Sequence, residues 1–77
     1  MAMKIIFSDH ALLKISQRRL LKKRIILTAE NPDLVKLSYN SREKRYKHFG
    51  KNWLKVVVIK QAETLIVITA HWVARMK

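Results

Sequence analysis

A single proline divides this chain into two halves whose hydrophobic residues repeat with different periods. Before residues 31–33, which read Asn-Pro-Asp, apolar residues recur every three or four positions, as they do in an amphipathic helix. After them, apolar and polar residues alternate or form short β-branched runs, which is typical of strands. Because proline disfavours the helical conformation of the residue before it, the last helix is predicted to end here. The pattern predicts an α+β fold, with the helices first and the sheet second.

Two helices are predicted in the first half, after a short β-prone or extended lead-in at residues 3–7. Ser8 is a good N-cap for the first helix, because its hydroxyl can accept a hydrogen bond from a free backbone N–H of the first turn. Leu12 and Ile15 share the side of this helix that is expected to pack. The second helix is expected over residues 21–30, with three apolar residues on its buried side, Ile25, Ile26 and Ala29.

The second half is predicted to form four strands separated by three short turns. The strands are expected at residues 34–39, 44–49, 53–60 and 65–73. Turns of this length favour hairpins between neighbouring antiparallel strands. We therefore expect two N-terminal helices packed on one face of a four-stranded antiparallel sheet, with the other face free to bind a partner.

Charge is the strongest compositional signal. Seventeen Lys and Arg residues oppose five Asp and Glu residues, which gives a net charge of +12. A compact domain with this charge attracts polyanions, and nucleic acid is the first candidate because its phosphates bind Lys and Arg with release of counterions. An anionic membrane surface and an acidic protein are the alternatives that charge alone leaves open.

Chain length, apolar runs and cysteine content indicate how many domains the chain forms and in which compartment it is expected. The 77 residues fit one small domain, residues 1–77. The longest apolar runs, such as residues 56–59, are far too short to span a membrane, so no membrane association by a spanning segment is expected. The chain has no cysteine, which excludes disulfide and thiolate chemistry and fits a cytoplasmic protein.

Three segments resemble a known family: HALLKISQRRLL at residues 10–21, NPD at 31–33 and LKVVVIKQAETLIVITAHW at 54–72. A family of small bacterial and archaeal domains shares the pattern His-Ala-x-x-Arg-x-x-x-Arg-Gly-Ile. Its first helices end in Asn-Pro-Asp, and a basic hairpin and two apolar strands ending in Val-Ile-Thr-Ala follow. This family is similar to the RelE/BrnT-type toxins, which have the barnase–EndoU–colicin–RelE ribonuclease fold. The resemblance covers nearly the whole chain and implies a toxin-type endoribonuclease neutralised by an antitoxin.

The match to this pattern is partial. His10 and Arg18 match the His and the second Arg of the pattern, and Arg45 falls where such toxins often keep a basic residue on the second strand. Lys14 replaces the first Arg, which keeps the charge but loses the bidentate guanidinium. Arg19 replaces the Gly that would close the helix in the left-handed conformation, so either this residue costs roughly 1 kcal/mol or the turn is built differently.

RNA cleavage without a metal requires a base for the 2′-hydroxyl, an acid for the leaving oxygen and cations for the phosphate. Histidine can serve as base or acid because its pKa lies near neutrality. The catalytic candidates are His10, Arg45 and His71, and the candidates for nucleic-acid binding are Lys14, Arg18, Lys47, Lys55 and Arg75. The acidic residues are scattered and no zinc spacing or phosphate-binding glycine loop is present, so we expect no metal and no cofactor.

The segment KRYKHF, residues 44–49, gives the most informative strand pattern. Alternation places Arg45 and Lys47 on one face and Tyr46 on the other. If Tyr46 packs toward the helices, Arg45 and Lys47 project from the open sheet face, where cations beside aromatic rings suit RNA. The alternative is an edge strand whose charges prevent aggregation.

Several alternatives stay open at this point. His10 can pin its helix to the sheet, and His71 can be a surface residue beside a core Trp72. The whole chain can be a non-catalytic nucleic-acid-binding module, or a basic interaction subunit for an acidic protein. If it is a toxin, the expected partners are RNA and an acidic antitoxin, and the sequence does not define an oligomeric state.

Overall fold

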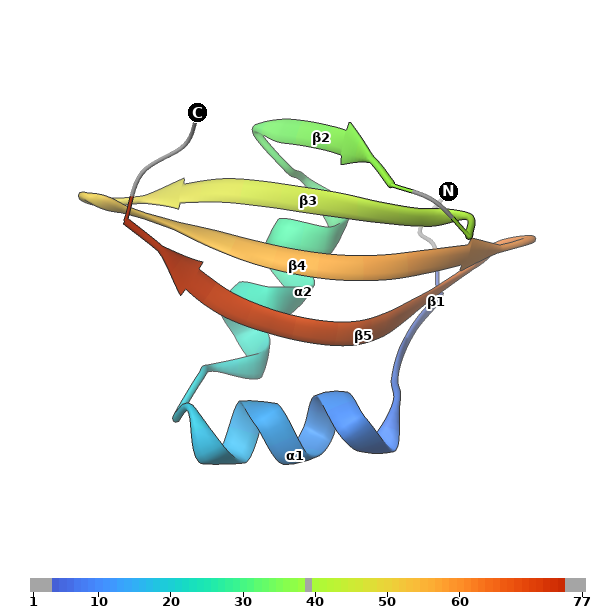
Figure 1. Ribbon diagram of the computed structural model, residues 1–77, viewed down its shortest axis with the longest axis horizontal. Helices are drawn as coiled ribbons and strands as arrows, with labels where there is room; N and C mark the ends of the chain where they lie inside the picture. Colours follow the sequence, from blue (N-terminus) through green and yellow to red (C-terminus); the bar gives the residue numbers. More distant parts are fainter. Residues whose placement is uncertain (1–3, 39, 75–77) are drawn as a thin grey trace.

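The computed structural model describes residues 4–38 and 40–74, which form two helices and five strands (Figure 1). Their bounds are β1 Lys4–Phe7, α1 Asp9–Gln17, α2 Lys22–Glu30, β2 Leu34–Leu37, β3 Arg42–Phe49, β4 Asn52–Gln61 and β5 Thr64–Val73. The strands form one sheet in the order β1-β5-β4-β3-β2. Two helices packed on a sheet confirm the predicted α+β class and the order of helices and strands. Helix α2 ends directly before the Asn-Pro-Asp segment, as predicted.

The prediction of a four-stranded, purely antiparallel sheet was wrong in one respect. Strand β1, which the sequence suggested only as a lead-in, pairs in parallel with residues 64–67 of β5. The remaining strands form the expected antiparallel meander. The paired residues Lys4 and Thr64 are about 60 positions apart, and parallel strands are joined by long crossovers without a local turn signal. The chain between β1 and β5 comprises both helices and strands β2, β3 and β4.

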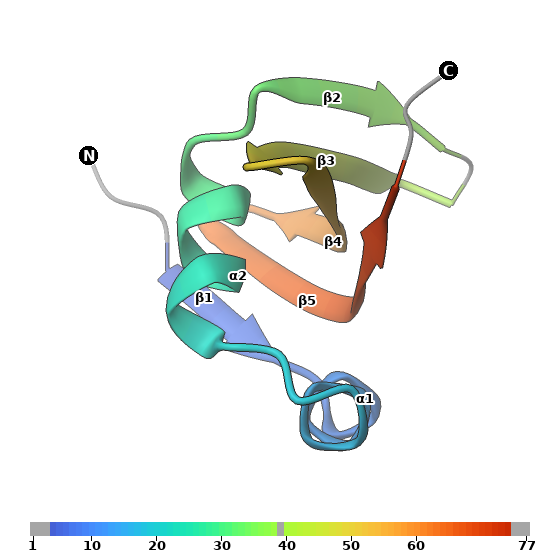
Figure 2. The same cartoon turned by 90° about the vertical axis from the view of Figure 1, so that its left-hand side faces the viewer.

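Helix α1 begins as its sequence predicts. The Ser8 hydroxyl accepts a hydrogen bond from the Ala11 N–H at 3.1 Å, which caps the first turn. Ala11 and Ile15 are buried, but Leu12 is 39% exposed, so the expectation that Leu12 packs inward was wrong. The reason is the position of α1, which packs beside β5 (Figure 2), so that only Ala11 and Ile15 of this helix are buried.

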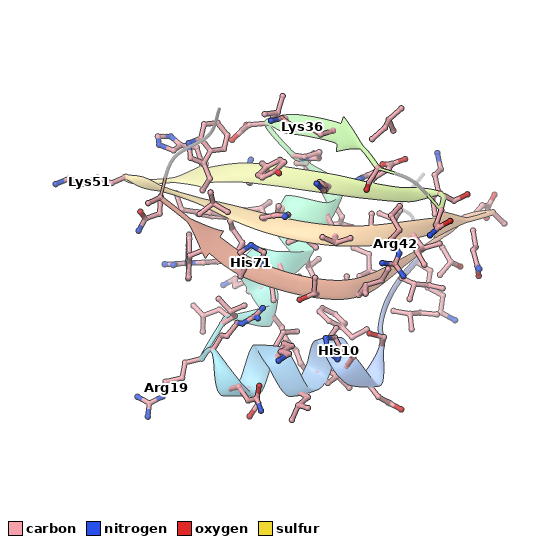
Figure 3. The ribbon with its side chains drawn as sticks, viewed as in Figure 1. His10, Arg19, Lys36, Arg42, Lys51 and His71 are labelled. Atoms are coloured by element: carbon pink, nitrogen blue, oxygen red, sulfur yellow. The ribbon has the colours of Figure 1, made fainter. Side chains whose placement is uncertain are left out.

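Helix α1 ends in the two hydrogen bonds of a Schellman motif. The Leu20 N–H donates to the Ile15 carbonyl at 3.0 Å, and the Arg19 N–H donates to the Ser16 carbonyl at 3.3 Å. Arg19 has φ +53°, the left-handed conformation that the family pattern fills with glycine. Its side chain points away from the body of the protein (Figure 3). A non-glycine residue therefore carries conformational strain at this position.

Replacing Arg19 with glycine is expected to raise the free energy of unfolding by about 1 kcal/mol, because glycine adopts positive φ without strain. In a domain of this size, that change raises Tm by about 4–8 °C. Thermal unfolding of Arg19→Gly and Arg19→Ala, measured under the same conditions, tests this prediction. Alanine removes the charge but keeps the strain, so an equal rise in both variants would assign the effect to charge.

The core lies between the sheet and the helices. Helix α2 packs on β3 and β4, and α1 packs on β5. The buried apolar residues come from both helices, from the α1–α2 connection and from the two central strands: Ala11, Ile15, Leu20, Ile25, Ala29, Leu54, Val56, Val58, Leu65, Val67 and Ala70. Figure 2 shows α2 on one side of the sheet, and no described helix lies over the other side, which we call the uncovered face. In the described part of the chain, no helix has the length and apolarity needed to cross a bilayer.

Candidate active site on the uncovered sheet face

A histidine, a lysine and a tyrosine lie side by side across three strands. Lys55 on β4 is the cross-strand partner of His71 on β5 and of Tyr46 on β3. The neighbours of Lys55 along β4, Leu54 and Val56, are buried against the helices. Because successive side chains of a strand point to opposite faces, Lys55 and its two partners lie on the uncovered face. Figure 3 shows His71 on this side of the sheet.

Arg18 reaches the same place from α1. Strand β1 pairs with residues 64–67, and within residues 4–38 and 40–74 no strand lies on the outer side of the second half of β5. The Arg18 Nη1 atom donates a hydrogen bond to the Ala70 carbonyl at 2.8 Å and a longer one to the Thr69 hydroxyl at 3.4 Å. The guanidinium is thereby held at the peptide that joins Ala70 to His71. We call Arg18, Lys44, Tyr46, Lys55 and His71 together the His71 site.

The surroundings of His71 favour its neutral form. Burial lowers the pKa of His71 below its usual 6.5, and the positive charges of Lys55 and Arg18 lower it further. The pKa of Lys55 is also lowered, first by burial and then by the charge of Lys44. At neutral pH, His71 is therefore a proton acceptor, and Lys55 releases its proton more readily than an ordinary lysine. An acceptor and a donor side by side among cations can carry out acid–base chemistry on a phosphate.

Arg45 points the other way, so the expectation that it projects from the open face was wrong. Its cross-strand partner is the buried Val56, which places it on the helix-facing side. Its Nη1 atom donates to the Ala29 carbonyl in the last turn of α2. Its Nε and Nη2 atoms donate to Glu43 Oε1 at 3.0 and 2.8 Å. Arg45 thus caps the end of α2 and neutralises a partly buried carboxylate.

Lys47 follows Arg45 on the helix-facing side, which also contradicts its expected position. Its Nζ atom donates to the Asn31 carbonyl at 3.0 Å and lies 3.7 Å from Asp33 Oδ1. Tyr46 is correspondingly on the uncovered face, not toward the helices. It is nevertheless only 6% exposed, and Lys36 Nζ lies 5.8 Å from its ring centroid. Tyr46 is therefore buried on the face opposite to the one that was expected.

The other predicted residues lie apart from the His71 site or cannot be placed. His10 is exposed at the start of α1, and Figure 3 shows it well away from His71. Lys14 is half-buried on α1, one turn before Arg18. Arg75 lies outside the described residues. The structure therefore brings together His71, Lys55 and Arg18, and does not bring His10 or Arg45 to them.

Tyr46 and Lys44 are the members of the His71 site that sequence reasoning missed. Strand alternation correctly grouped them on one face of β3, but it could not tell which face the helices cover. A signal for the uncovered face was available in β4, where Lys55 is flanked by apolar residues on both sides. In a strand, the neighbours of Lys55 point to the opposite face from Lys55 itself. Within residues 4–38 and 40–74, no three His, Asp or Glu side chains gather into a candidate metal site.

The fold matches that of a solved toxin. The crystal structure of BrnT, a ribonuclease toxin of Brucella abortus, superposes with a TM-score of 0.69 over 96% of this chain and 100% of that chain. The two sequences are 20% identical, and at this distance the likeness establishes the fold. No family model and no curated protein matches the chain. The predicted similarity to the BrnT-type toxins is confirmed: this chain has the BrnT-type ribonuclease-toxin fold.

Proposed function

We propose that this protein is a toxin-type endoribonuclease that cleaves RNA at the His71 site. The observation that carries the proposal is the cross-strand pairing of His71 with Lys55 on the uncovered face, beside the guanidinium of Arg18. The toxin fold and the net charge of +12 support it, because both fit a protein that acts on a polyanion.

In the proposed reaction the ribose 2′-oxygen attacks the adjacent phosphorus while His71 accepts the 2′-hydroxyl proton. The bond from phosphorus to the 5′-oxygen breaks, and Lys55 donates a proton to that oxygen. Arg18 and Lys44 stabilise the negative charge that develops on the phosphoryl oxygens. The products are a 2′,3′-cyclic phosphate and a 5′-hydroxyl, and none of these steps uses a metal ion.

The direct test is incubation of the purified protein with RNA in excess chelator. We expect fragments that end in 2′,3′-cyclic phosphate, and growth arrest when the protein is expressed in bacteria. Intact RNA after incubation with well-folded protein would contradict the proposal. Salt-dependent RNA binding without cleavage would instead identify a non-catalytic nucleic-acid-binding module.

We further propose a cytoplasmic location and an acidic antitoxin that covers the uncovered face. A partner of that charge would neutralise the cations of the His71 site and exclude RNA from it. Co-expression with a small acidic protein encoded beside this one is expected to restore growth. If affinity capture recovers one acidic protein while the purified chain neither binds nor cleaves RNA, the chain is a basic interaction subunit.

The pH dependence of cleavage follows from the lowered pKa of His71. Protonation removes the base, so kcat/KM is expected to fall as the pH drops, with a midpoint below 6.5. Replacing Arg18 with glutamine removes one of the charges that lower this pKa, so the midpoint is expected to move upward. Single-turnover cleavage at a series of pH values measures both. An acidic midpoint above 6.5 in the wild-type protein would exclude His71 as the base.

A further inference from the structure

Two aromatic rings form an exposed pair on the uncovered face. His48 on β3 and Trp53 on β4 are cross-strand partners, with ring centroids 4.9 Å apart and planes tilted by 38°. His48 is exposed and Trp53 is half-buried. The backbone beneath them is fixed, because the His48 N–H donates to Asp33 Oδ2 at 3.0 Å. Neither ring contributes to the core between the sheet and the helices.

The pair lies next to the His71 site along the strands. Trp53 is two residues before Lys55 on β4, and its partner on β5, Val73, is two residues after His71. Side chains two apart on a strand point to the same face and are about 7 Å from each other. The rings therefore flank the point at which His71 and Lys55 meet.

We infer that His48 and Trp53 form a subsite that stacks the RNA base flanking the phosphate held by His71 and Lys55. The inference rests on the proposed function and adds to it how the substrate is held. Every nucleobase has a flat face that stacks on aromatic side chains, whereas duplex RNA buries its bases. The subsite therefore selects single-stranded RNA and accepts any base, with a preference for the larger rings of purines.

The second tryptophan serves as a built-in control, because it is on the opposite side of the sheet. Trp72 packs edge-on against Phe49 at 5.9 Å between centroids, and Arg24 lies 5.9 Å from the Trp72 ring centroid. Its cross-strand partner is the buried Leu54, which places it on the helix-facing side. The chain has two tryptophans, so replacing either one leaves a single fluorescent reporter for one face.

The test is tryptophan fluorescence during titration with a single-stranded 2′-O-methyl RNA, which lacks the nucleophile and is not cleaved. The Trp72→Phe variant keeps Trp53, and we expect the Trp53 emission to be strongly quenched when the protein is saturated with RNA. Trp53→Phe keeps Trp72, and we expect little change. Fluorescence anisotropy of labelled RNA measures binding independently in both variants.

The affinity of the variants for RNA provides a second test of the subsite. Trp53→Leu is expected to weaken binding of the single-stranded RNA about tenfold, and His48→Ala to weaken it less. An otherwise identical RNA with abasic positions should bind the wild-type protein and Trp53→Leu about equally. RNA that binds by anisotropy without quenching Trp53, or that quenches only Trp72, overturns the subsite and leaves the proposed function in place. RNA that does not bind at all overturns both.

Discussion

Replacing His71 with alanine is expected to lower kcat/KM for RNA cleavage by about 10²- to 10⁴-fold, the usual contribution of a positioned acid or base. Binding of 2′-O-methyl RNA should change little, because Lys55 and Arg18 remain to contact phosphate. His71 is only partly buried, and its partner in the sheet is the polar Lys55. The fold should therefore survive the change, and circular dichroism checks that it does.

His10→Ala is the matched control, since it removes an exposed imidazole that is well away from His71 (Figure 3). We expect it to cleave RNA at close to the wild-type rate. Added imidazole should partly restore cleavage by His71→Ala, because it replaces the missing base, whereas it could not repair a misfolded protein. Loss of cleavage in His10→Ala together with normal cleavage in His71→Ala would reverse the assignment.

Replacing Arg45 with alanine is expected to lower the free energy of unfolding by roughly 2 to 3 kcal/mol. The change removes the hydrogen bonds to the Ala29 carbonyl and to Glu43. It also leaves the Glu43 carboxylate, whose side chain is 20% exposed, without its cation. In a domain of this size, Tm should fall by about 10 to 20 °C. Differential scanning calorimetry measures the loss.

Arg42→Ala is the control for Arg45, because Arg42 is exposed on the same strand and carries the same charge. Its effect on stability should stay within about 0.5 kcal/mol. At a temperature where Arg45→Ala is still folded, the Arg45→Ala protein should cleave RNA at the wild-type rate. If Arg45→Ala keeps the wild-type Tm but no longer cleaves RNA, the result would instead support the catalytic role that the sequence suggested for Arg45.

The features that the sequence predicted correctly depend on neighbouring residues. The Ser8 cap and the end of α2 before Pro32 each follow from the conformational preference of one residue and its nearest neighbours. The antiparallel hairpins follow from the short turns. The parallel pairing of β1 with β5 has no such local signal, because it joins the ends of the chain.

The candidate site was only partly predictable, and β3 shows why. Hydrophobicity suggested that Tyr46 faces the helices and Arg45 faces solvent, and the structure has the reverse. A charged residue can face a helix when that helix ends in free carbonyls and a carboxylate is two residues away. Glu43 is close to Arg45 in the sequence, but the Ala29 carbonyl becomes its partner only in the folded chain. Arg18 reached the site for a similar reason, since its bond to Ala70 spans 52 positions.

The central position of β5 sets the order in which this protein can become active during synthesis. Strand β5 lies between β4 and β1 and carries His71, so neither the complete sheet nor the His71 site exists until this strand has left the ribosome. Pairing of such distant segments is also slow compared with local folding. A nascent chain of the proposed toxin would therefore be inert toward the ribosome's own RNA until β5 has emerged.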